Sequence, residues 1–181
     1  MSILDHTQIN GLVEKSQAGD SSAFAELYDL LIDEIYRFIY YKTNQKELAE
    51  DLCAETFIKV WQNLDKYQNQ GQNFSAWVYR IAHNITMDYF RQNKTILEEL
   101  DEVDILSAED PRQETENFFN QQILQKAIQN LPDMQKEAII LKYINDLSNV
   151  EIAKVLDKSE TAVRVLLSRG ITKLKEKNLN I

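Results

Sequence analysis

One stretch near the C-terminal end, SNVEIAKVLDKSETAVRVLLSR (residues 148–169), constrains the fold most strongly, because it predicts two short helices joined by a tight turn. Ser148 and Glu151 stand three residues apart before an apolar run, which is the pattern of a capping box. Asp157 falls where the chain must turn, at a position that commonly adopts a positive φ. Ser159 can then cap a second helix. The segment therefore predicts a helix-turn-helix.

The apolar positions of the two helices recur at helical spacing and predict that the helices pack together. They are Ile152, Ala153 and Leu156 in the first helix and Val163, Leu166 and Ile171 in the second. The rest of the second helix carries donors and acceptors that suit the base edges and phosphates of a major groove. These exposed positions are Glu160, Thr161, Arg164, Val165, Ser168 and Arg169.

The charge distribution favours DNA binding over a hairpin that only packs, which is the alternative reading of the motif alone. From Lys158 to the C-terminal residue there are six lysines and arginines against two acids, in a chain whose formal net charge is -9. Basic residues therefore gather where a DNA backbone would lie.

Most of the negative charge lies in one segment. Between residues 95 and 120 there are nine acidic residues and one arginine, with a proline and few large apolar side chains. Such a segment buries too little surface to offset the entropy of ordering it. We therefore predict a flexible acidic linker over residues 95–120, either a solvated tether or the occupant of a cationic groove. The linker would join two small helical domains, residues 1–94 and 121–181, each near the lower size limit for its own core.

The chain as a whole predicts an all-α fold. It contains only four glycines and two prolines, and long amphipathic stretches dominate. The helices are expected at about residues 7–17, 21–42, 46–64, 75–92, 118–130, 133–145, 149–156 and 160–177.

Catalytic and metal-binding side chains are scarce. The single cysteine, Cys53, lies among apolar residues and indicates a core or interface position rather than a nucleophile. The two histidines, His6 and His83, are far apart and have no cysteine at metal-ligand spacing. There is no Walker-type loop. We expect a protein that is not an enzyme and has no metal site, cofactor or small-molecule substrate.

No apolar stretch approaches the length needed to span a bilayer, and the first residues, MSILDHTQ, lack a basic region followed by an apolar one. We expect a cytoplasmic protein that does not insert into a membrane.

A second polar surface is expected in the first domain. Residues 64–73, LDKYQNQGQN, form a polar loop between two amphipathic helices, and loops of this kind often carry function. The helix that follows has polar residues every three or four positions, opposite Trp77, Ile81 and Ile85. This stripe consists of Arg80, Asn84, Asp88, Arg91 and Lys94. A solvated face is the alternative, but asparagine among arginines suits hydrogen bonding to bases.

Three segments together resemble the extracytoplasmic-function (ECF) sigma factors, the small promoter-recognition subunits of bacterial RNA polymerase. AEDLCAETFIKVW (residues 49–61) and FSAWVYRIAHNITMDYFRQ (residues 74–92) look like the sigma-two pattern, and LPDMQKEAIILKYINDLSNVEIAKVLDKSETAV (residues 131–163) looks like the sigma-four pattern. The segments lie in the family's order on either side of the acidic linker. The resemblance implies promoter recognition and local melting, with core polymerase and promoter DNA as partners.

The resemblance also assigns residues to three surfaces. One helix would dock on the coiled coil of the polymerase clamp through Glu50, Asp51, Ala54, Glu55 and Thr56. The loop around residues 67–73, which would hold a flipped base, and the following helix would bind the single-stranded minus-ten element through Tyr67, Asn69, Asn73, Arg80, Asn84, Asp88 and Arg91. The helix-turn-helix would read the minus-thirty-five duplex through Ser159, Thr161, Arg164, Val165, Ser168, Arg169 and Lys173. The linker would thread toward basic channels of the polymerase.

The chain departs from the family pattern in two places. Ala54 stands where the family usually has glutamine, and Val165 replaces a polar residue of the reading helix. We therefore expect an unusual minus-thirty-five preference, with an apolar contact to a thymine methyl. The resemblance further implies an anti-sigma partner. If that partner is membrane-bound, it would also hold this protein at the membrane. Two rival hypotheses are a stand-alone helix-turn-helix regulator and a decoy that occupies an anti-sigma protein without transcribing.

Overall fold

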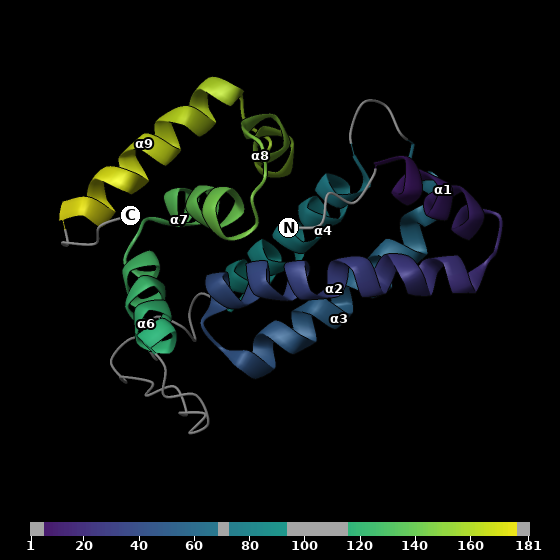
Figure 1. Cartoon of the computed structure of the whole chain (residues 1–181), viewed down its shortest axis with the longest axis horizontal. Coiled ribbons are helices and arrows are strands. Elements are labelled where there is room, and N and C mark those ends of the chain that lie inside the picture. The colour runs from purple at the N-terminus through teal and green to yellow at the C-terminus, as the bar shows by residue number, and fades with distance from the viewer. Residues whose placement is uncertain (1–5, 69–72, 94–115, 177–181) are drawn as a thin grey trace.

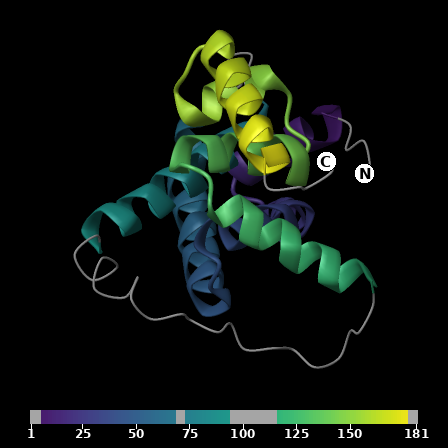
Figure 2. The same ribbon diagram turned by 90° about the vertical axis from the view of Figure 1, so that its left-hand side faces the viewer.

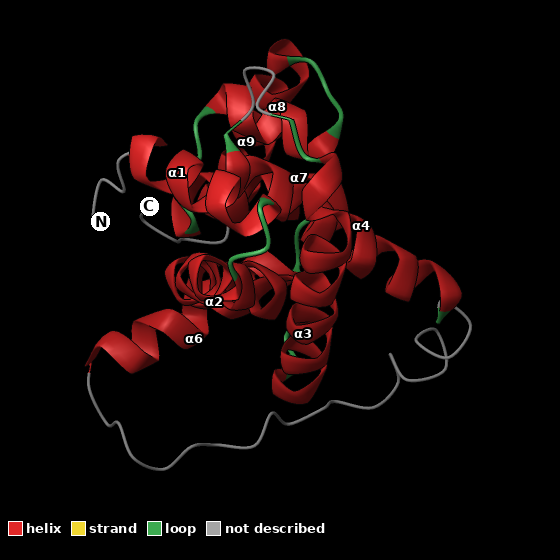
Figure 3. Cartoon of the chain, turned by 90° about the vertical axis from the view of Figure 1, so that its right-hand side faces the viewer, coloured by secondary structure: helices red, strands yellow, loops and turns green. Residues whose placement is uncertain are grey.

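The structure, a computed structural model, describes residues 6–68, 73–93 and 116–176. Every regular element in these ranges is helical, which confirms the predicted all-α class (Figure 3). The helices begin and end within a residue or two of the expected positions. No helix among the described residues is long and apolar enough to cross a membrane.

The N-terminal unit is built around a long central helix, α2, which contacts the three other α-helices of the unit (Figure 1). Its elements are α1 (His6–Gln17), α2 (Ser21–Thr43), α3 (Lys46–Asn63), the short 3-10 turn η1 (Leu64–Lys66) and α4 (Phe74–Gln92). Phe38 of α2 and Tyr79 of α4 are almost completely buried, and their rings meet edge to face with centroids 5.7 Å apart. Aromatic contacts of this geometry add to the stabilisation from burial alone.

Side-chain caps fix where the helices of this unit start. Asp20 accepts hydrogen bonds from the backbone N–H groups of Ser22 and Ala23, at 2.9 and 3.2 Å, and so begins α2. Asn73 accepts one from Ala76, at 2.7 Å, and begins α4. Each cap satisfies backbone donors that the first helical turn leaves free.

The C-terminal unit holds the helix-turn-helix. Its elements are α6 (Glu116–Gln129), α7 (Asp133–Ile139), the π-helical turn η2 (Ile140–Ile144), α8 (Asn149–Leu156) and α9 (Glu160–Glu176). The expected helix over 133–145 is therefore α7 continued by a π turn. Helix α6 begins inside the range predicted as linker, and the remainder of that linker, with the flexibility expected of it, lies outside the described residues.

The inner face of α9 differs from the expected one. Val163, Leu167 and Leu174 are its buried apolar side chains, whereas Leu166 and Ile171 are only partly buried. The buried face that α9 packs on α7 also includes Gly170, where an added Cβ would lie 2.9 Å from Cγ1 of Ile139. A larger residue at position 170 would therefore force Ile139 or the helices to shift.

The two units pack against each other rather than standing apart. Helix α8 lies against α4, and α2 contacts both α6 and η2. Figures 1 and 2 show the C-terminal unit, green to yellow, resting on the N-terminal unit. The buried apolar residues of both units form one cluster, so each unit extends its small core by burying part of the other.

Cys53 provides a chemical test of the packing around α3 in the N-terminal unit. Its side chain is buried in α3, and burial raises the pKa of the thiol to about 12. Because the thiolate is the reactive form, Cys53 in the folded chain should react with Ellman's reagent at pH 8 at least about a hundredfold more slowly than in guanidinium chloride. Rapid labelling of the folded protein would contradict the packing around α3.

Candidate nucleic-acid interface

The predicted capping box is present at the start of α8. The Ser148 backbone N–H and hydroxyl donate to Oε2 of Glu151, at 2.8 and 2.7 Å, and Oγ of Ser148 accepts from the Glu151 backbone N–H at 3.3 Å. These reciprocal bonds hold the first helix of the motif at a fixed starting point.

The turn between α8 and α9 also forms as the sequence predicts. Asp157 adopts a left-handed conformation with φ of 52°. The backbone N–H groups of Asp157 and Lys158 both donate to the carbonyl of Ala153. Ser159 then accepts a hydrogen bond from the backbone of Ala162 at 3.2 Å and caps α9. These contacts fix the angle at which α9 leaves α8.

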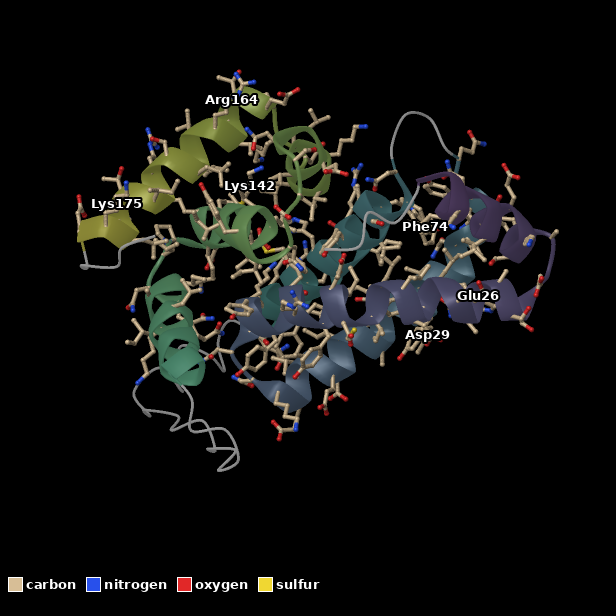
Figure 4. The ribbon with its side chains drawn as sticks, in the orientation of Figure 1. Glu26, Asp29, Phe74, Lys142, Arg164 and Lys175 are labelled. Atoms are coloured by element: carbon tan, nitrogen blue, oxygen red, sulfur yellow. The ribbon has the colours of Figure 1, made fainter. Side chains whose placement is uncertain are left out.

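The outer face of α9 presents the residues that the sequence assigned to duplex DNA. All are exposed: Ser159, Thr161, Arg164, Val165, Ser168, Arg169 and Lys173. In Figure 4 Arg164 lies at the outer end of α9 and points away from the body of the molecule. Its guanidinium pairs with Glu160 at 3.3 Å, and both side chains are largely solvated. Exposed pairs of this kind are weak, so Arg164 can exchange Glu160 for another partner at little cost.

A shallow hollow of about 470 Å³ borders this face. It is lined mainly by apolar atoms and runs between the start of α7 and the first turns of α9. Its lining residues are Met134, Lys158, Ser159, Thr161, Ala162, Val165 and Leu166. Val165 therefore stands at the edge of an apolar surface, with 42% of its side chain exposed.

The polar stripe of α4 is present as predicted. Arg80, Asn84, Asp88 and Arg91 are all exposed. Asp88 and Arg91 form an ion pair of 2.9 Å that orients the arginine along the helix. Lys94, which would continue the stripe, lies outside the described residues.

The loop before α4 corrects one expectation. The Tyr67 ring is only 7% exposed, and its centroid lies 5.2 Å from that of Phe74 and 5.0 Å from that of Trp77. The ring therefore does not face solvent as a platform for a flipped base. Gln17 holds this turn by donating to the carbonyl oxygens of Leu64 and Tyr67. Asn69 lies outside the described residues.

Helix α3 carries the surface assigned to the polymerase. Glu50, Asp51, Ala54 and Glu55 are exposed on it. Thr56 is not available to a partner, because it is fully buried and its hydroxyl donates to the carbonyl of Leu52 at 2.7 Å. Thr56 therefore does not present its side chain on this face of α3, in contrast to the four residues above.

Sequence reasoning missed the apolar end of this helix. Ile58 and Trp61 are 56% and 47% exposed, whereas the helical spacing of Trp61 with aliphatic neighbours favours a core position. The Trp61 ring packs edge to face on Phe24 with centroids 4.7 Å apart, so one edge is supported while the rest faces solvent.

The described residues contain no group of three or more histidine, cysteine, aspartate or glutamate side chains placed to hold a metal ion. His83, one of the two histidines, lies against a carboxylate of the C-terminal unit, with Nδ1 3.0 Å from Oε1 of Glu137.

Comparisons with known proteins agree with this geometry. Residues 27–96 match the model of Sigma-70 region 2, and residues 121–174 match that of Sigma-70 region 4. The two units are thus regions of a sigma-70-type factor. The chain is 30% identical over 176 residues to the ECF RNA polymerase sigma factor SigW of Bacillus subtilis, with 87% of this chain and 90% of SigW covered.

A second relative and a solved structure support the same conclusion. The ECF RNA polymerase sigma factor BldN of Streptomyces coelicolor is 33% identical over 174 residues, and the match covers 94% of this chain and 66% of BldN. The sigma factor RpoE in complex with the anti-sigma factor NepR, from Bartonella quintana, superposes with a TM-score of 0.74 at 26% identity, covering 87% of this chain and 98% of RpoE. The chain belongs to the ECF RNA polymerase sigma factor family.

The left-handed turn residue gives a stability test of the motif. Glycine adopts the φ of Asp157 without steric cost, so Asp157→Gly should raise the free energy of unfolding by about 0.5–1 kcal/mol. The matched change Asp29→Gly, in the interior of α2, should lower it, because glycine is a poor helix former. Urea denaturation measures both, and an equal loss in the two variants would contradict the turn geometry.

Proposed function

We propose that this chain directs bacterial RNA polymerase core to specific promoters and helps to melt them. The observation that carries the proposal is the coexistence, in one member of the family, of three exposed surfaces on separate helices. These are the basic reading face of α9, the polar stripe of α4 and the acidic face of α3.

Helix α9 is proposed to read the minus-thirty-five element as a duplex. Its face combines arginine with short hydroxyl side chains, which supply base-edge contacts and phosphate contacts respectively. Val165 and the apolar hollow beside it suit the methyl group of a thymine. This is the basis for an unusual base preference at one position of the element.

Helix α4 and the loop before it are proposed to bind the single-stranded minus-ten element. Extruding a base costs a few kcal/mol, which contacts in the pocket must offset. Arg80, Asn84 and Arg91 supply hydrogen-bond donors along α4, whereas the buried Tyr67 ring packs on Phe74 and Trp77. The platform for a base must therefore come from other residues of this region.

Helix α3 is proposed to dock on the polymerase clamp. Glu50, Asp51 and Glu55 give it an acidic face, and Ala54 offers no polar group on that face. A stand-alone regulator has no use for such a face, which counts against that rival. A decoy would not need a well-formed helix-turn-helix, and the intact turn at Asp157 counts against it.

The remaining expectations form part of this proposal. Residues 1–94 would act at the minus-ten element and the polymerase, residues 121–181 at the minus-thirty-five element, and the segment between them as a connector. The protein would work in the cytoplasm as a regulatory subunit and not as an enzyme. An anti-sigma protein is the expected inhibitor, as NepR is the named partner of the similar RpoE.

Run-off transcription tests the proposal. Core polymerase is incubated with a library of promoter fragments, with and without this chain, and the transcripts are mapped. Defined start sites that require the chain support a sigma factor. Binding to duplex DNA by the chain alone, without any effect on transcription, would favour the regulator instead.

Replacing Arg164 tests the role of α9. Arg164→Ala should weaken binding to the selected minus-thirty-five duplex by about 1–3 kcal/mol, or roughly 5- to 150-fold, and relax the preference at one base position. Lys175→Ala, near the other end of α9 (Figure 4), should leave base preference unchanged. Uniform weakening across all sequences by Arg164→Ala would make it a phosphate contact.

A further inference from the structure

The contact between the two units is polar and specific. Three side-chain hydrogen bonds from the C-terminal unit tie it to α2 and its C-terminal cap. They run from Asn145 to the Glu34 carbonyl at 2.9 Å, from Gln129 to the Tyr41 carbonyl at 2.7 Å and from Gln125 to Oδ1 of Asn44 at 3.0 Å. Side chains that donate to backbone carbonyls of another unit fix the relative position of the two.

A buried ionic cluster lies at the centre of this contact. Glu137 of α7 is fully buried, and one of its carboxylate oxygens, Oε1, accepts hydrogen bonds from Lys42 of α2 and His83 of α4. Lys42 is itself only 5% exposed. Since an ionised carboxylate can only accept, the tautomer of His83 that fits this contact has its hydrogen on Nδ1 and donates a hydrogen bond to this oxygen. The cluster therefore joins three helices from two units.

The charges of the cluster depend on the contact. Burial alone would raise the pKa of Glu137, but the His83 hydrogen bond and the Lys42 charge outweigh it and hold that pKa below its usual value. Burial lowers the pKa of Lys42, and the Glu137 charge opposes this. Removing one partner would leave a buried charge unpaired, which is far more costly than losing an exposed pair.

The same contact covers part of the surface proposed for the minus-ten strand. Asn73, at the start of α4, donates a hydrogen bond to Glu151 in the capping box of α8. Arg80 lines a hollow of about 420 Å³ together with Lys154, Asp157 and other residues of α8 and the following turn. The outer face of α9 stays exposed. The contact therefore covers the start of the α4 surface and leaves the α9 surface free.

The arrangement cannot engage both promoter elements together. Elements centred near positions -10 and -35 are about 25 base pairs apart, or roughly 85 Å at about 3.4 Å per base pair. Helix α4 is instead in direct contact with α8, the helix that packs against α9 in the helix-turn-helix. This step rests on the proposed function, because it takes α4 and α9 as the two DNA-binding helices.

We infer that the free chain rests in a closed state, in which its C-terminal unit docks on α2 and α4 through the Lys42–Glu137–His83 cluster and engages Asn73 at the start of the proposed minus-ten surface. Polymerase binding must then open this contact. The partner of the α2 and α4 surface is the chain's own C-terminal unit, and no second protein is needed to close it.

Energy transfer between two dyes on the full-length free protein tests the closed state. Asp29→Cys on α2 and Lys175→Cys on α9 provide exposed attachment sites on the two units (Figure 4), while Cys53 is buried. The parent should give one narrow, compact distribution. Glu137→Lys and Lys42→Glu should each broaden the distribution and lengthen the mean distance. The double variant, which restores opposite charges, should return toward the parent.

A matched charge change and a measurement of helix content separate opening of the contact from a general effect of charge and from unfolding. Glu14→Lys makes the same charge change as Glu137→Lys on an exposed face of α1, and should leave the distribution unchanged. Circular dichroism should show the same helix content in all variants. Should Glu137→Lys lose helix, Glu137→Gln takes its place. The Lys42–Glu137–His83 cluster acts as the latch of this closed state. Identical distributions in the parent and in folded variants of the latch would overturn the closed state.

A second readout separates this inference from the proposed function. If nine tenths of the free chains are closed and strand binding requires a free Asn73, opening should strengthen binding of a labelled pool of random single-stranded DNA about tenfold. Binding to duplex DNA through α9 should change little. Opened variants without any gain in strand binding would support the latch and count against α4 as the minus-ten surface. A gain without opening would overturn the latch.

Discussion

The arrangement of this molecule depends on one buried carboxylate. Glu137 is completely enclosed where α2, α4 and α7 meet, and its charge is tolerable there only because Lys42 and His83 contact it. Breaking such a pair by removing one partner costs about 3–5 kcal/mol, whereas replacing the whole cluster with apolar side chains can be neutral. The cluster is therefore better understood as a device that fixes how the units meet than as a source of stability.

Each unit is small, and this explains why the units share a core. A domain of this size buries a limited fraction of its surface, and the contact between α4 and α8 adds apolar burial to both. The polar cluster at the centre of the contact has the opposite tendency, because its charges are better solvated when the units separate. A contact that combines the two can hold the chain closed and still be opened by a partner that offers comparable surface.

Charged side chains of opposite sign are concentrated on different helices. The chain is acidic overall, yet the C-terminal helix presents arginine and lysine to solvent while α3 presents glutamate and aspartate. Electrostatic fields act locally, since exposed charges more than a Debye length apart are largely screened. One acidic chain can therefore bind DNA on one face and a protein on another.

Local rules predicted what local interactions determine. The capping box of Ser148 and Glu151 and the left-handed turn at Asp157 could be read from residues a few positions apart, and the structure has both. Helix α9 buries Leu167, whereas the spacing of apolar residues predicted Leu166. The buried face is set by packing on α7, a segment distant in the sequence, and local spacing does not contain that information. Burial of Tyr67 and Thr56 likewise arises from packing between helices.

The interdomain cluster had no sequence signal at all. Lys42 and Glu137 are 95 positions apart in the chain, and each lies in a helix where a charged residue would ordinarily be assigned to solvent. Only the packing of three helices brings these charges together, so sequence patterns could predict the two units but not how they close on each other.

The most direct test of the account is the distance between the units when polymerase is present. Spin labels at Asp29→Cys and Lys175→Cys report this distance by pulsed electron–electron double resonance. The measurement is made in the free chain and in its complex with core polymerase and promoter DNA. The account predicts a compact distribution in the free chain and a shift to distances longer by tens of ångströms in the complex. An unchanged distribution in a transcriptionally active complex would contradict it, because α4 would then remain packed against the helix-turn-helix during initiation.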